Sequence, residues 1–353
     1  MVIAVAVSGG MDSLYVLQSL HESGQNIFAI HGCFLPSGNE RGARGLEEFC
    51  FSRSIPLHCI DLRAEFERHV ISSFCAEYLA GLTPNPCARC NGIIKFGALW
   101  KAARDLGATR LATGHYVRMR HHPSASNALL PLAGIDVKKD QSYFLSLTPV
   151  ARLREALFPL GGRLKSDIAV ELARRGILPP LPDESQDICF VPGNDYRGFL
   201  QSRNASLPGP GAVEDASGRR LGEHNGLWRH TEGQRRGMGI AAAHPLYVLR
   251  KDRARNVLIV GGKEESLCRA CRVEQVNYML EPSQWPGGPD AEVLVRMRYR
   301  QTAQPALAQC SSHGMNIRFI QKQGVPAPGQ AAAVYDKQGY LLAGGIIVSS
   351  RTD

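Results

Sequence analysis

An apolar run at the start of the chain passes through a glycine turn directly into a helical pattern. VIAVAV (residues 2–7) has the continuous apolar character of a strand that is buried on both faces. After SGGMDS, Leu14, Leu17 and Leu20 fall on one helix face, and Gly24 provides a stop signal. A buried strand that hands over at once to a helix predicts a βα unit, in which helices cover the faces of a parallel sheet.

The same alternation of strand and helix continues along the first half of the chain. Further apolar strands are predicted at residues 27–34, 55–62 and 110–115, with amphipathic helical patterns between them. Repeated βα pairs of this kind predict an α/β fold with a parallel sheet wrapped by helices on both faces. We expect this domain to occupy residues 1–200.

Beyond residue 200 the pattern changes to glycine-, proline- and serine-rich sequence followed by short alternating runs. At 353 residues the chain exceeds the roughly 250–300 residues at which a single core stops growing, so further domains are expected. The alternating runs predict antiparallel strands with turn signals between them. We assign them to two small β-rich domains, residues 201–263 and 264–353, divided near the GGKEES of 261–266.

Composition narrows the cellular setting and the partners. No stretch approaches the ~20 apolar residues that cross a bilayer, and the N-terminus lacks the basic region of a signal peptide. With ten cysteines and no secretory signal, the chain is expected in the cytoplasm, with no membrane partner and with reduced thiols. A net charge of +9 favours a polyanionic partner, and arginine clusters at 118–121, 229–237 and 296–302 suit phosphate contacts. The alternative is that this charge serves solubility alone.

SGGMDS stands at the point where backbone amides and a helix N-terminus favour an anion. Ser8 and Ser13 add hydroxyl donors, and Asp12 is a candidate ligand for Mg²⁺ or a brace for the loop. The hexamer is neither the GxxxxGK[ST] of a P-loop nor the GxGxxG of dinucleotide binders. We interpret it as a phosphate cradle, and the alternative is a tight βα turn without a ligand.

The segment TPNPCARCN (83–91) places Cys87 and Cys90 two residues apart in a predicted loop. Such a pair is half of a zinc site, with CRAC (268–271) supplying Cys268 and Cys271, or a redox motif, or the carrier of sulfur chemistry. Zinc ribbons usually hold both pairs within about 15–20 residues, which disfavours the first alternative. The other cysteines are predicted to be small buried side chains. They are Cys33, Cys50, Cys59, Cys75 and Cys310.

Several long motifs resemble, in family order, those of the tRNA-specific 2-thiouridylases, which belong to the pyrophosphate-loop ATPases. They are SGGMDS, TPNPCARCN with IIKFG, ATGHY, KKDQSYFL, PDESQDICFV, HTEGQRRGMGI, RYRQ and PGQAAAVYD. The resemblance implies an adenine nucleotide alpha hydrolase-like N-terminal domain. It also implies ATP-dependent 2-thiolation of the wobble uridine of tRNA, by adenylation of the uracil C2 oxygen and replacement of that oxygen by sulfur.

Site residues carry over by position from this resemblance. For ATP and Mg²⁺ they are Ala6, Val7, Ser8, Gly9, Gly10, Met11, Asp12, Ser13, Gly32 and Gly114. For the tRNA anticodon stem loop they are His115, Lys139, Asp140, Gln141, Arg298, Tyr299 and Gln330. Gly32 lies in a segment that is shorter than the family pattern. His115 has a second interpretation as a core histidine at a strand end, although ligands of open α/β sheets bind at that edge.

The resemblance assigns catalysis to Cys90, which attacks or resolves, and to Cys189, which carries the incoming sulfur as a persulfide. Nearby Arg89 and Lys95 are expected to lower a thiol pKa. Cys87 replaces an aspartate of many relatives. With Cys90 and Cys189 it makes a three-cysteine set that suits a [4Fe-4S] cluster with one open iron site. The sulfur source is then a donor protein or inorganic sulfide.

Two other functions remain open from the sequence. Another pyrophosphate-loop ligase would act on a small molecule and would need neither Cys90 nor Cys189. A non-catalytic RNA-binding protein would retain the nucleotide fold without turnover. Exchange of ATP with pyrophosphate that depends on tRNA would separate both from a tRNA sulfurtransferase.

Overall fold

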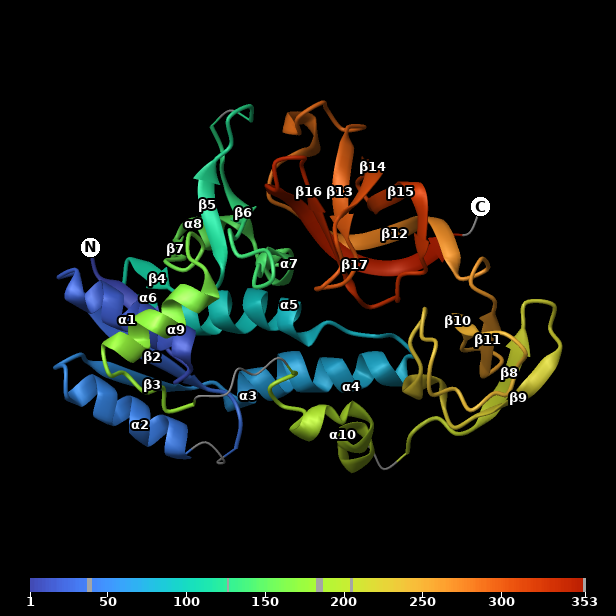
Figure 1. The fold of residues 1–353 in the computed structure, drawn as a ribbon, viewed down its shortest axis with the longest axis horizontal. Helices are drawn as coiled ribbons and strands as arrows, with labels where there is room; N and C mark the ends of the chain where they lie inside the picture. Colours follow the sequence, from blue (N-terminus) through green and yellow to red (C-terminus); the bar gives the residue numbers. More distant parts are fainter. Residues whose placement is uncertain (37–39, 126, 182–186, 204–205, 352–353) are drawn as a thin grey trace.

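The computed structural model describes the chain except for residues 37–39, 126, 182–186, 204–205 and 352–353. Three parts follow one another along the chain (Figure 1): an α/β part, a small β sheet and a closed β barrel. The fold class predicted from the sequence is confirmed. Within the described residues, no helix is long and apolar enough to span a membrane.

The α/β part is built on a five-stranded sheet of order β3-β2-β1-β4-β7, in which all neighbouring strands run parallel. Its strands are β1 (Ile3–Ala6), β2 (Ile27–Cys33), β3 (Leu57–Asp61), β4 (Arg110–Ala112) and β7 (Ala156–Leu157). The first four coincide with the predicted runs. The edge strand β7 was not predicted, because a strand of two residues is too short to produce a period.

Helices cover both faces of this sheet, as the continuous apolar strands require. Ile3 and Val5 of β1 join the core that contains Leu14 of α1, whereas Ala4 joins the opposite core with Phe66. The helices are α1 (Met11–Glu22), α2 (Glu40–Phe51), α3 (Arg63–Phe66), α4 (Ser72–Leu79), α5 (Pro86–Cys90), α6 (Trp100–Asp105), α7 (Ser142–Leu145), α8 (Val150–Arg154), α9 (Lys165–Arg174) and α10 (Tyr196–Arg203). The other helical segments are η1 (Glu67–Ile71) and η2 (Asn91–Leu99), both π-helical, and η3 (Pro192–Asn194), η4 (Leu227–Arg229) and η5 (Pro282–Gln284), which are 3₁₀ turns.

An antiparallel hairpin extends from this part toward the barrel. Its strands are β5 (Val117–His121) and β6 (Leu129–Ala133). Ala133 N donates a hydrogen bond to Gly339 O of the barrel at 3.1 Å, an ordinary length for a backbone hydrogen bond. The hairpin therefore contributes to the contact between the first and last parts of the chain.

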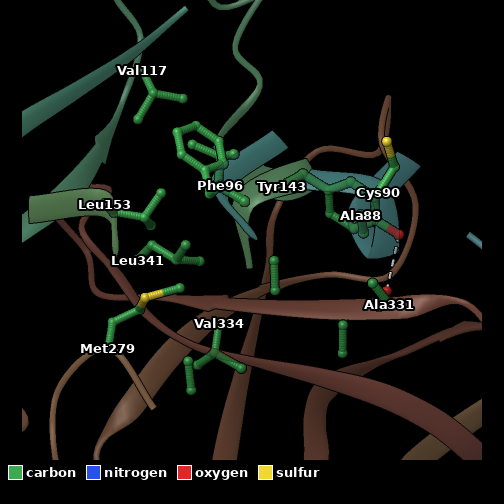
Figure 2. Close-up of a cluster of buried hydrophobic side chains, with 14 of the residues drawn as sticks. Ala88, Cys90, Phe96, Val117, Tyr143, Leu153, Met279, Ala331, Val334 and Leu341 are labelled. Carbon is green, nitrogen blue, oxygen red and sulfur yellow. Dashed lines mark hydrogen bonds between the residues drawn. The ribbon is translucent and has the colours of Figure 1, made fainter. Parts of the chain in front are cut away.

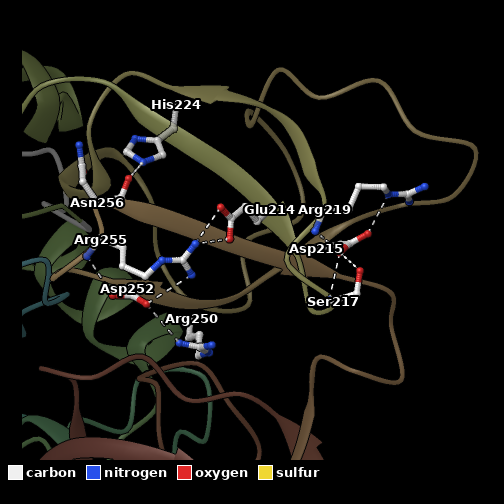
Figure 3. A network of polar contacts seen from close by, with 9 residues as sticks. All are labelled: Glu214, Asp215, Ser217, Arg219, His224, Arg250, Asp252, Arg255 and Asn256. Carbon is white, nitrogen blue, oxygen red and sulfur yellow. Dashed lines mark hydrogen bonds and ion pairs between the residues drawn. The ribbon is translucent and has the colours of Figure 1, made fainter.

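The middle part is a four-stranded sheet of order β10-β11-β8-β9. Its strands are β8 (Gly211–Asp215), β9 (Arg220–His224), β10 (Tyr247–Asp252) and β11 (Val257–Gly261). The prediction of purely antiparallel pairing is wrong here, because β8 and β11 run parallel. Pairing joins strands that are distant in sequence, so local turn signals could not reveal it. Figure 3 shows polar contacts on this sheet, where Arg255 donates to both carboxylate oxygens of Glu214 at 2.9 and 3.0 Å.

The last part is a closed six-stranded barrel of order β12-β15-β14-β13-β16-β17. Its strands are β12 (Leu267–Tyr278), β13 (Glu292–Arg296), β14 (Gln304–Ser311), β15 (Gly314–Gly324), β16 (Ala331–Tyr335) and β17 (Leu341–Arg351). Closure pairs the outer strands with each other and removes exposed sheet edges. The fully buried β16 (AAAVY) reads as a continuous apolar run because both of its faces are covered.

The barrel packs directly on the α/β part through one continuous apolar core. Figure 2 shows Phe96 and Leu153 of the first part facing Leu341 of the barrel, and all three belong to one buried cluster. Tyr143 Oη donates a hydrogen bond to Ala331 O at 3.0 Å across the same contact. The barrel is thereby held beside the helix that carries Cys90, at one edge of the sheet.

Candidate active site at the carboxyl edge of the sheet

The turn between β1 and α1 is closed by its own side chains. Gly9 adopts a φ of +83°, which favours glycine. Ser13 Oγ donates to Gly10 O at 3.0 Å and accepts from Ser8 N at 3.1 Å. Gly10, the residue before α1, gives the helix no side-chain cap. The first-turn amides of α1 are therefore directed at the position where an anion would bind.

Asp12 is engaged by two residues that are distant in sequence. Tyr116 Oη donates to Asp12 Oδ1 at 2.7 Å, and Lys165 Nζ lies 2.6 Å from the same oxygen. Of the two roles considered for this carboxylate, bracing of the loop is the one that these contacts provide. Neither Tyr116 nor Lys165 carried a signal in the sequence that pointed to this position.

The two predicted glycines outside the turn occupy different settings. A Cβ on Gly114 would lie 3.1 Å from Asp12 Cβ and 3.2 Å from Ser13 N, so glycine allows the end of β4 to approach the first turn of α1. A Cβ on Gly32 would instead meet the Phe34 ring at 2.6 Å. Gly114 is thus part of the wall of the turn, whereas Gly32 makes room for an aromatic side chain.

His115 connects this wall to the cysteine helix. Its Nδ1 lies 2.9 Å from Thr113 Oγ1 and its Nε2 lies 3.2 Å from Asn91 Oδ1. Burial lowers the pKa of His115 well below its usual value, and the positive charge of Lys95 lowers it further. The imidazole is therefore neutral at physiological pH. His115 is buried, as the interpretation of a core histidine predicts. It also lies beside Asn91, the residue that follows Cys90, so it stands close to the candidate site.

Cys87 and Cys90 lie on a short helix, so the predicted loop is wrong at these residues. The sequence contains the reason: Asn85 Oδ1 accepts from Ala88 N at 3.1 Å as an N-cap, and Pro86 occupies the first helical position. The π-helical η2 continues directly from this helix. Such π-helical segments are frequent at functional sites.

The thiols of Cys87, Cys90 and Cys189 are electrostatically coupled to one another. Burial raises the pKa of Cys90 to about 12, Lys95 opposes the rise, and the neighbouring Cys189 and Cys87 add to it. Burial likewise raises the pKa of Cys87 and of Cys189, with Lys95 again opposing. Cys90 is buried, whereas Cys189 is exposed as a residue. The fold thus brings the three cysteines into one neighbourhood that shares one cation.

The predicted influence of Arg89 on these thiols is wrong. Its Nη2 lies 2.5 Å from Glu77 Oε1, so the guanidinium is committed to that carboxylate. Burial raises the pKa of Glu77 even with Arg89 beside it. The expected lowering of a thiol pKa is also outweighed, because the cost of burying a thiolate exceeds the attraction of Lys95.

Two of the residues predicted to contact tRNA, Gln330 and Tyr299, lie where the barrel meets the cysteine segment and α7. Gln330 Nε2 donates to Thr83 O at 3.0 Å and to Pro84 O at 3.1 Å, beside the start of the cysteine segment. The Tyr299 ring lies against the Phe144 ring, with 4.3 Å between the centroids and a tilt of 36° between the ring planes. The remaining ones are the exposed Arg298 and the half-buried Lys139 and Gln141.

Asp140 is placed differently from the expectation of an RNA contact. Its side chain is 1% exposed and pairs with Arg296 of the barrel at 2.5 Å. The carboxylate also accepts from Gly134 N, Ser142 N and Ser142 Oγ at 2.9–3.1 Å. A buried carboxylate with four donors links the first part of the chain to the barrel, and it presents no oxygen to a nucleic acid.

The other cysteines divide between buried and accessible positions. Cys50 and Cys75 are buried as predicted, Cys33 and Cys310 are half-buried, and the prediction for Cys59 is wrong because it is exposed. Cys268 and Cys271 are buried in β12 of the barrel. In the described part of the chain, no group of three or more His, Cys, Asp or Glu side chains is placed to hold a metal ion. The two CxxC pairs therefore do not assemble the zinc site considered above.

The first strand of the parallel sheet is followed by an uncapped helix N-terminus, with thiols and a β barrel beside it. These features define an α/β nucleotide-binding protein with a sulfur-bearing site. The chain matches the tRNA methyl transferase HUP domain over residues 1–193 and the tRNA methyl transferase PRC-barrel domain over residues 197–262. Residues 268–347 match the aminomethyltransferase beta-barrel domain.

Relatives of known name align with the chain along nearly their whole length. The chain is 52% identical to the tRNA-specific 2-thiouridylase MnmA of Nitratidesulfovibrio vulgaris (strain Miyazaki F) over 99% of both chains. It is 49% identical to the protein of the same name from Oleidesulfovibrio alaskensis, over 98% of this chain and 99% of that one. The chain belongs to the tRNA-specific 2-thiouridylase (MnmA) family, as the resemblance in the sequence predicted.

A solved structure with a distant likeness is "U34-tRNA thiolase NcsA from Methanococcus maripaludis with its [4Fe-4S] cluster". It shares 17% identity and a TM-score of 0.35, and the match covers 57% of this chain and 65% of that chain. A likeness at this level adds nothing about the site.

Proposed function

We propose that this chain is a tRNA-uridine 2-sulfurtransferase, which uses ATP to form 2-thiouridine at the wobble position of tRNA. The observation that carries the proposal is a continuous path of contacts from the glycine turn to the thiols. Gly114 packs on Asp12, the adjacent His115 bonds to Asn91, and Asn91 follows Cys90. An adenylated base and a sulfur nucleophile would therefore meet at one edge of the sheet.

The glycine turn suits the triphosphate of ATP. The uncapped first turn of α1 and the left-handed Gly9 leave backbone N–H groups for an anion. Tyr116 and Lys165 brace the turn through Asp12 Oδ1, and the second carboxylate oxygen, Oδ2, would be the ligand for Mg²⁺ that accompanies the nucleotide. Ala6 to Ser13 and Gly114 form this cradle in our proposal, and Gly32 lies beside it on β2.

The proposed reaction begins with attack of the uracil C2 oxygen on the α-phosphorus of ATP, and pyrophosphate leaves. The terminal sulfur of a Cys189 persulfide then attacks C2, and AMP leaves with the former C2 oxygen. The thiolate of Cys90 then attacks Cys189 Sγ. The bond between Cys189 Sγ and the transferred sulfur breaks, and 2-thiouridine leaves. The resulting disulfide between Cys90 and Cys189 is reduced by an external dithiol before the next cycle.

The different exposure of the two cysteines supports this division of roles. Cys189 is exposed and would accept sulfur from a donor protein, whereas Cys90 is buried and would act only inside the pocket. Lys95 is the cation that favours the thiolate at both positions against the effect of burial. Neutral His115 would hold Asn91, and with it the end of the cysteine helix, without adding charge.

A cluster-dependent variant of the same reaction is the second candidate, because Cys87 completes a set of three thiols. A [4Fe-4S] cluster, when bound, would supply an open iron site that carries hydrosulfide. The arrangement of the described side chains does not fit this group, since no three of them converge as metal ligands. We derive no step through a cluster.

The tRNA would lie across the junction of the first part and the barrel. Lys139, Gln141, Arg298, Tyr299 and Gln330 are our proposed contacts, and the net charge of +9 supports a polyanionic substrate. The adjacent Tyr299 and Phe144 rings offer aromatic side chains of the kind on which unpaired loop bases stack.

The decisive experiment is mass spectrometry of tRNA nucleosides from a deletion strain complemented with cysteine variants. We expect Cys90→Ala and Cys189→Ala to abolish 2-thiouridine and Cys87→Ala to retain it, with the exposed Cys59→Ser as a matched control. Loss with Cys87→Ala, together with iron in anaerobically reconstituted protein, would establish the cluster route instead. Wild-type protein without tRNA-dependent exchange of ATP and pyrophosphate would refute the enzyme assignment.

A further inference from the structure

Residues 229–233 of the middle part, RHTEG, touch both segments that carry the cysteines of the proposed sulfur transfer. We call these five residues the junction segment. They belong largely to the motif HTEGQRRGMGI, and no step of the proposed reaction uses that motif. The segment is tied to the middle sheet, because Gly233 N donates to Val248 O of β10 at 2.8 Å. It therefore presents a part of the middle domain to the candidate site.

The first contact of the junction segment is with the residues that lead into the cysteine helix. Thr231 Oγ1 lies 3.3 Å from Thr83 Oγ1, and Thr83 stands four residues before Cys87. Thr83 is buried, and its backbone N donates to Pro328 O of the barrel at 2.8 Å. The Asn85 cap of the cysteine helix follows Thr83 by two residues. The position of Thr83 therefore influences where that helix begins.

The second contact is with α10, the helix that follows the segment of Cys189. Arg229 O accepts hydrogen bonds from Tyr196 Oη at 3.1 Å and from Arg197 Nη2 at 2.8 Å, both at the start of α10. Phe190, the residue after Cys189, is buried, and its ring centroid lies 5.4 Å from that of a phenylalanine of α10. The position of Cys189 thus depends on α10, and α10 is held in turn by the junction segment.

A buried ion pair holds the junction segment between these two contacts. Lys251 Nζ of β10 lies 3.1 Å from Glu232 Oε2 and donates to His230 O at 2.9 Å. The Lys251 and Glu232 side chains are only 2% and 7% exposed. Because a buried ion pair adds little net stability, its main effect here is to fix the path of the main chain between Arg229 and Thr231.

The two contacts start from residues 229 and 231, which are neighbours on this fixed path. We infer that the junction segment is a positioning element for sulfur transfer, which sets the distance between Cys189 and Cys90. The inference rests on the proposed function, in which the thiolate of Cys90 must reach Cys189 Sγ. Reacting atoms need a separation of about 3–3.5 Å, and a misplacement of about 1 Å can cost about 100-fold in rate. Thr231 and Arg197 are the positioning residues, since their side chains make the two contacts.

A junction segment that only held the domains together would affect the reaction differently. Adenylation of the base depends on the glycine turn, which is braced by its own contacts with Tyr116 and Lys165. Loss of the positioning contacts should therefore slow sulfur transfer and leave adenylation intact. A loosened fold should impair both steps together.

The test is single-turnover kinetics on the full chain, with bulk tRNA from the deletion strain as substrate. Inorganic polysulfide supplies the sulfur atom of the persulfide before ATP is added. Thr231→Val removes the hydroxyl that faces Thr83, and Arg197→Met removes the shorter hydrogen bond to Arg229 O. For the combined variant at saturating tRNA, we expect 2-thiouridine to form about 10- to 100-fold more slowly than with wild type. The tRNA-dependent exchange of ATP with pyrophosphate should stay within about twofold of wild type, because a positioning contact acts on the later step alone.

Two further variants serve as controls. Thr231→Ser keeps the hydroxyl and should keep the wild-type rate of 2-thiouridine formation. Arg219→Met is the matched control for Arg197→Met, because Arg219 pairs with Asp215 at the exposed end of the β8–β9 hairpin. It should leave both rates unchanged.

The outcomes separate this inference from the proposed function. An unchanged rate of 2-thiouridine formation in the combined variant overturns the inference alone, and so does an equal loss of exchange and of thiolation. Wild-type protein that forms no 2-thiouridine overturns the proposed function and the inference with it. If the combined variant unfolds, as judged by thermal melting, Thr231→Val alone decides: a wild-type rate of 2-thiouridine formation overturns the inference.

Discussion

The buried ion pair between Asp140 and Arg296 predicts a large and specific loss of stability. Asp140→Ala removes the partner of a guanidinium whose side chain is only 16% exposed. It also removes the acceptor of two backbone N–H groups and of the Ser142 hydroxyl. Breaking one side of a buried pair costs about 3–5 kcal/mol, because the remaining charge stays in a poor solvent. In a domain of this size, that corresponds to a fall in melting temperature of roughly 6–20 °C.

Differential scanning calorimetry of Asp140→Ala, Arg296→Met and the double variant measures this effect. We expect the double variant to be more stable than the sum of the single changes predicts, by about 1–3 kcal/mol, since removing both partners leaves no buried charge. Asp140→Asn is the shape-matched control, because its amide oxygen still accepts from the backbone. Its loss should lie between those of wild type and Asp140→Ala.

A measurement of tRNA affinity would decide between bracing and direct contact for Asp140. If the carboxylate braces the barrel, Asp140→Ala should weaken tRNA binding only together with stability. An Asp140→Ala protein with the wild-type melting temperature but with lost tRNA affinity would show that Asp140 contacts the nucleic acid and that the burial argument is mistaken.

Three further predictions follow from single features of the fold. Gly161→Ala should strongly destabilise the protein, because its Cβ would clash with the Val117 carbonyl oxygen at the start of β5, whereas Gly162→Ala, with open space around it, should be near neutral in the same thermal melts. Burial lowers the pKa of His230 to about 4, so unfolded His230 takes up a proton below about pH 6.5 and folded His230 does not. Stability should therefore be full above that pH and should fall by at most about 1.4 kcal/mol per pH unit toward pH 4, a slope that His230→Asn should reduce. Limited alkylation followed by peptide mass spectrometry should label the exposed Cys59 well before the buried Cys90.

Each of these has a result that contradicts it. Equal melting temperatures for the two glycine variants would mean that the hairpin yields to an added methyl group. A stability profile that is flat between pH 4 and 6.5 would mean that His230 is protonated in the folded protein. Faster alkylation of Cys90 than of Cys59 at pH 8 would mean that the cysteine helix opens readily.

Local sequence determined the elements that place the nucleotide site. VIAVAV could only be a strand buried on both sides, and SGGMDS could only follow it as a turn into a helix, because apolar periodicity and glycine act over a few residues. The long motifs, from TPNPCARCN to PGQAAAVYD, also identified the family, since each combines several unusual residues. The same local signals were too weak for β7, a strand of two residues, and for the parallel pairing of β8 with β11, which are distant in sequence.

Tertiary structure alone decided which charges act at the site. Arg89 is next to Cys90 in sequence, yet it is committed to Glu77, whereas Lys95 influences all three thiols because helix packing brings them together. Asp140 stands among residues that resemble tRNA contacts, yet burial pairs it with Arg296. Lys165 reaches Asp12 from the start of α9, 153 positions further along the chain. Spacing along a chain specifies periodic elements, but the partner of a charge depends on burial and on long-range contacts, which no short stretch of sequence contains.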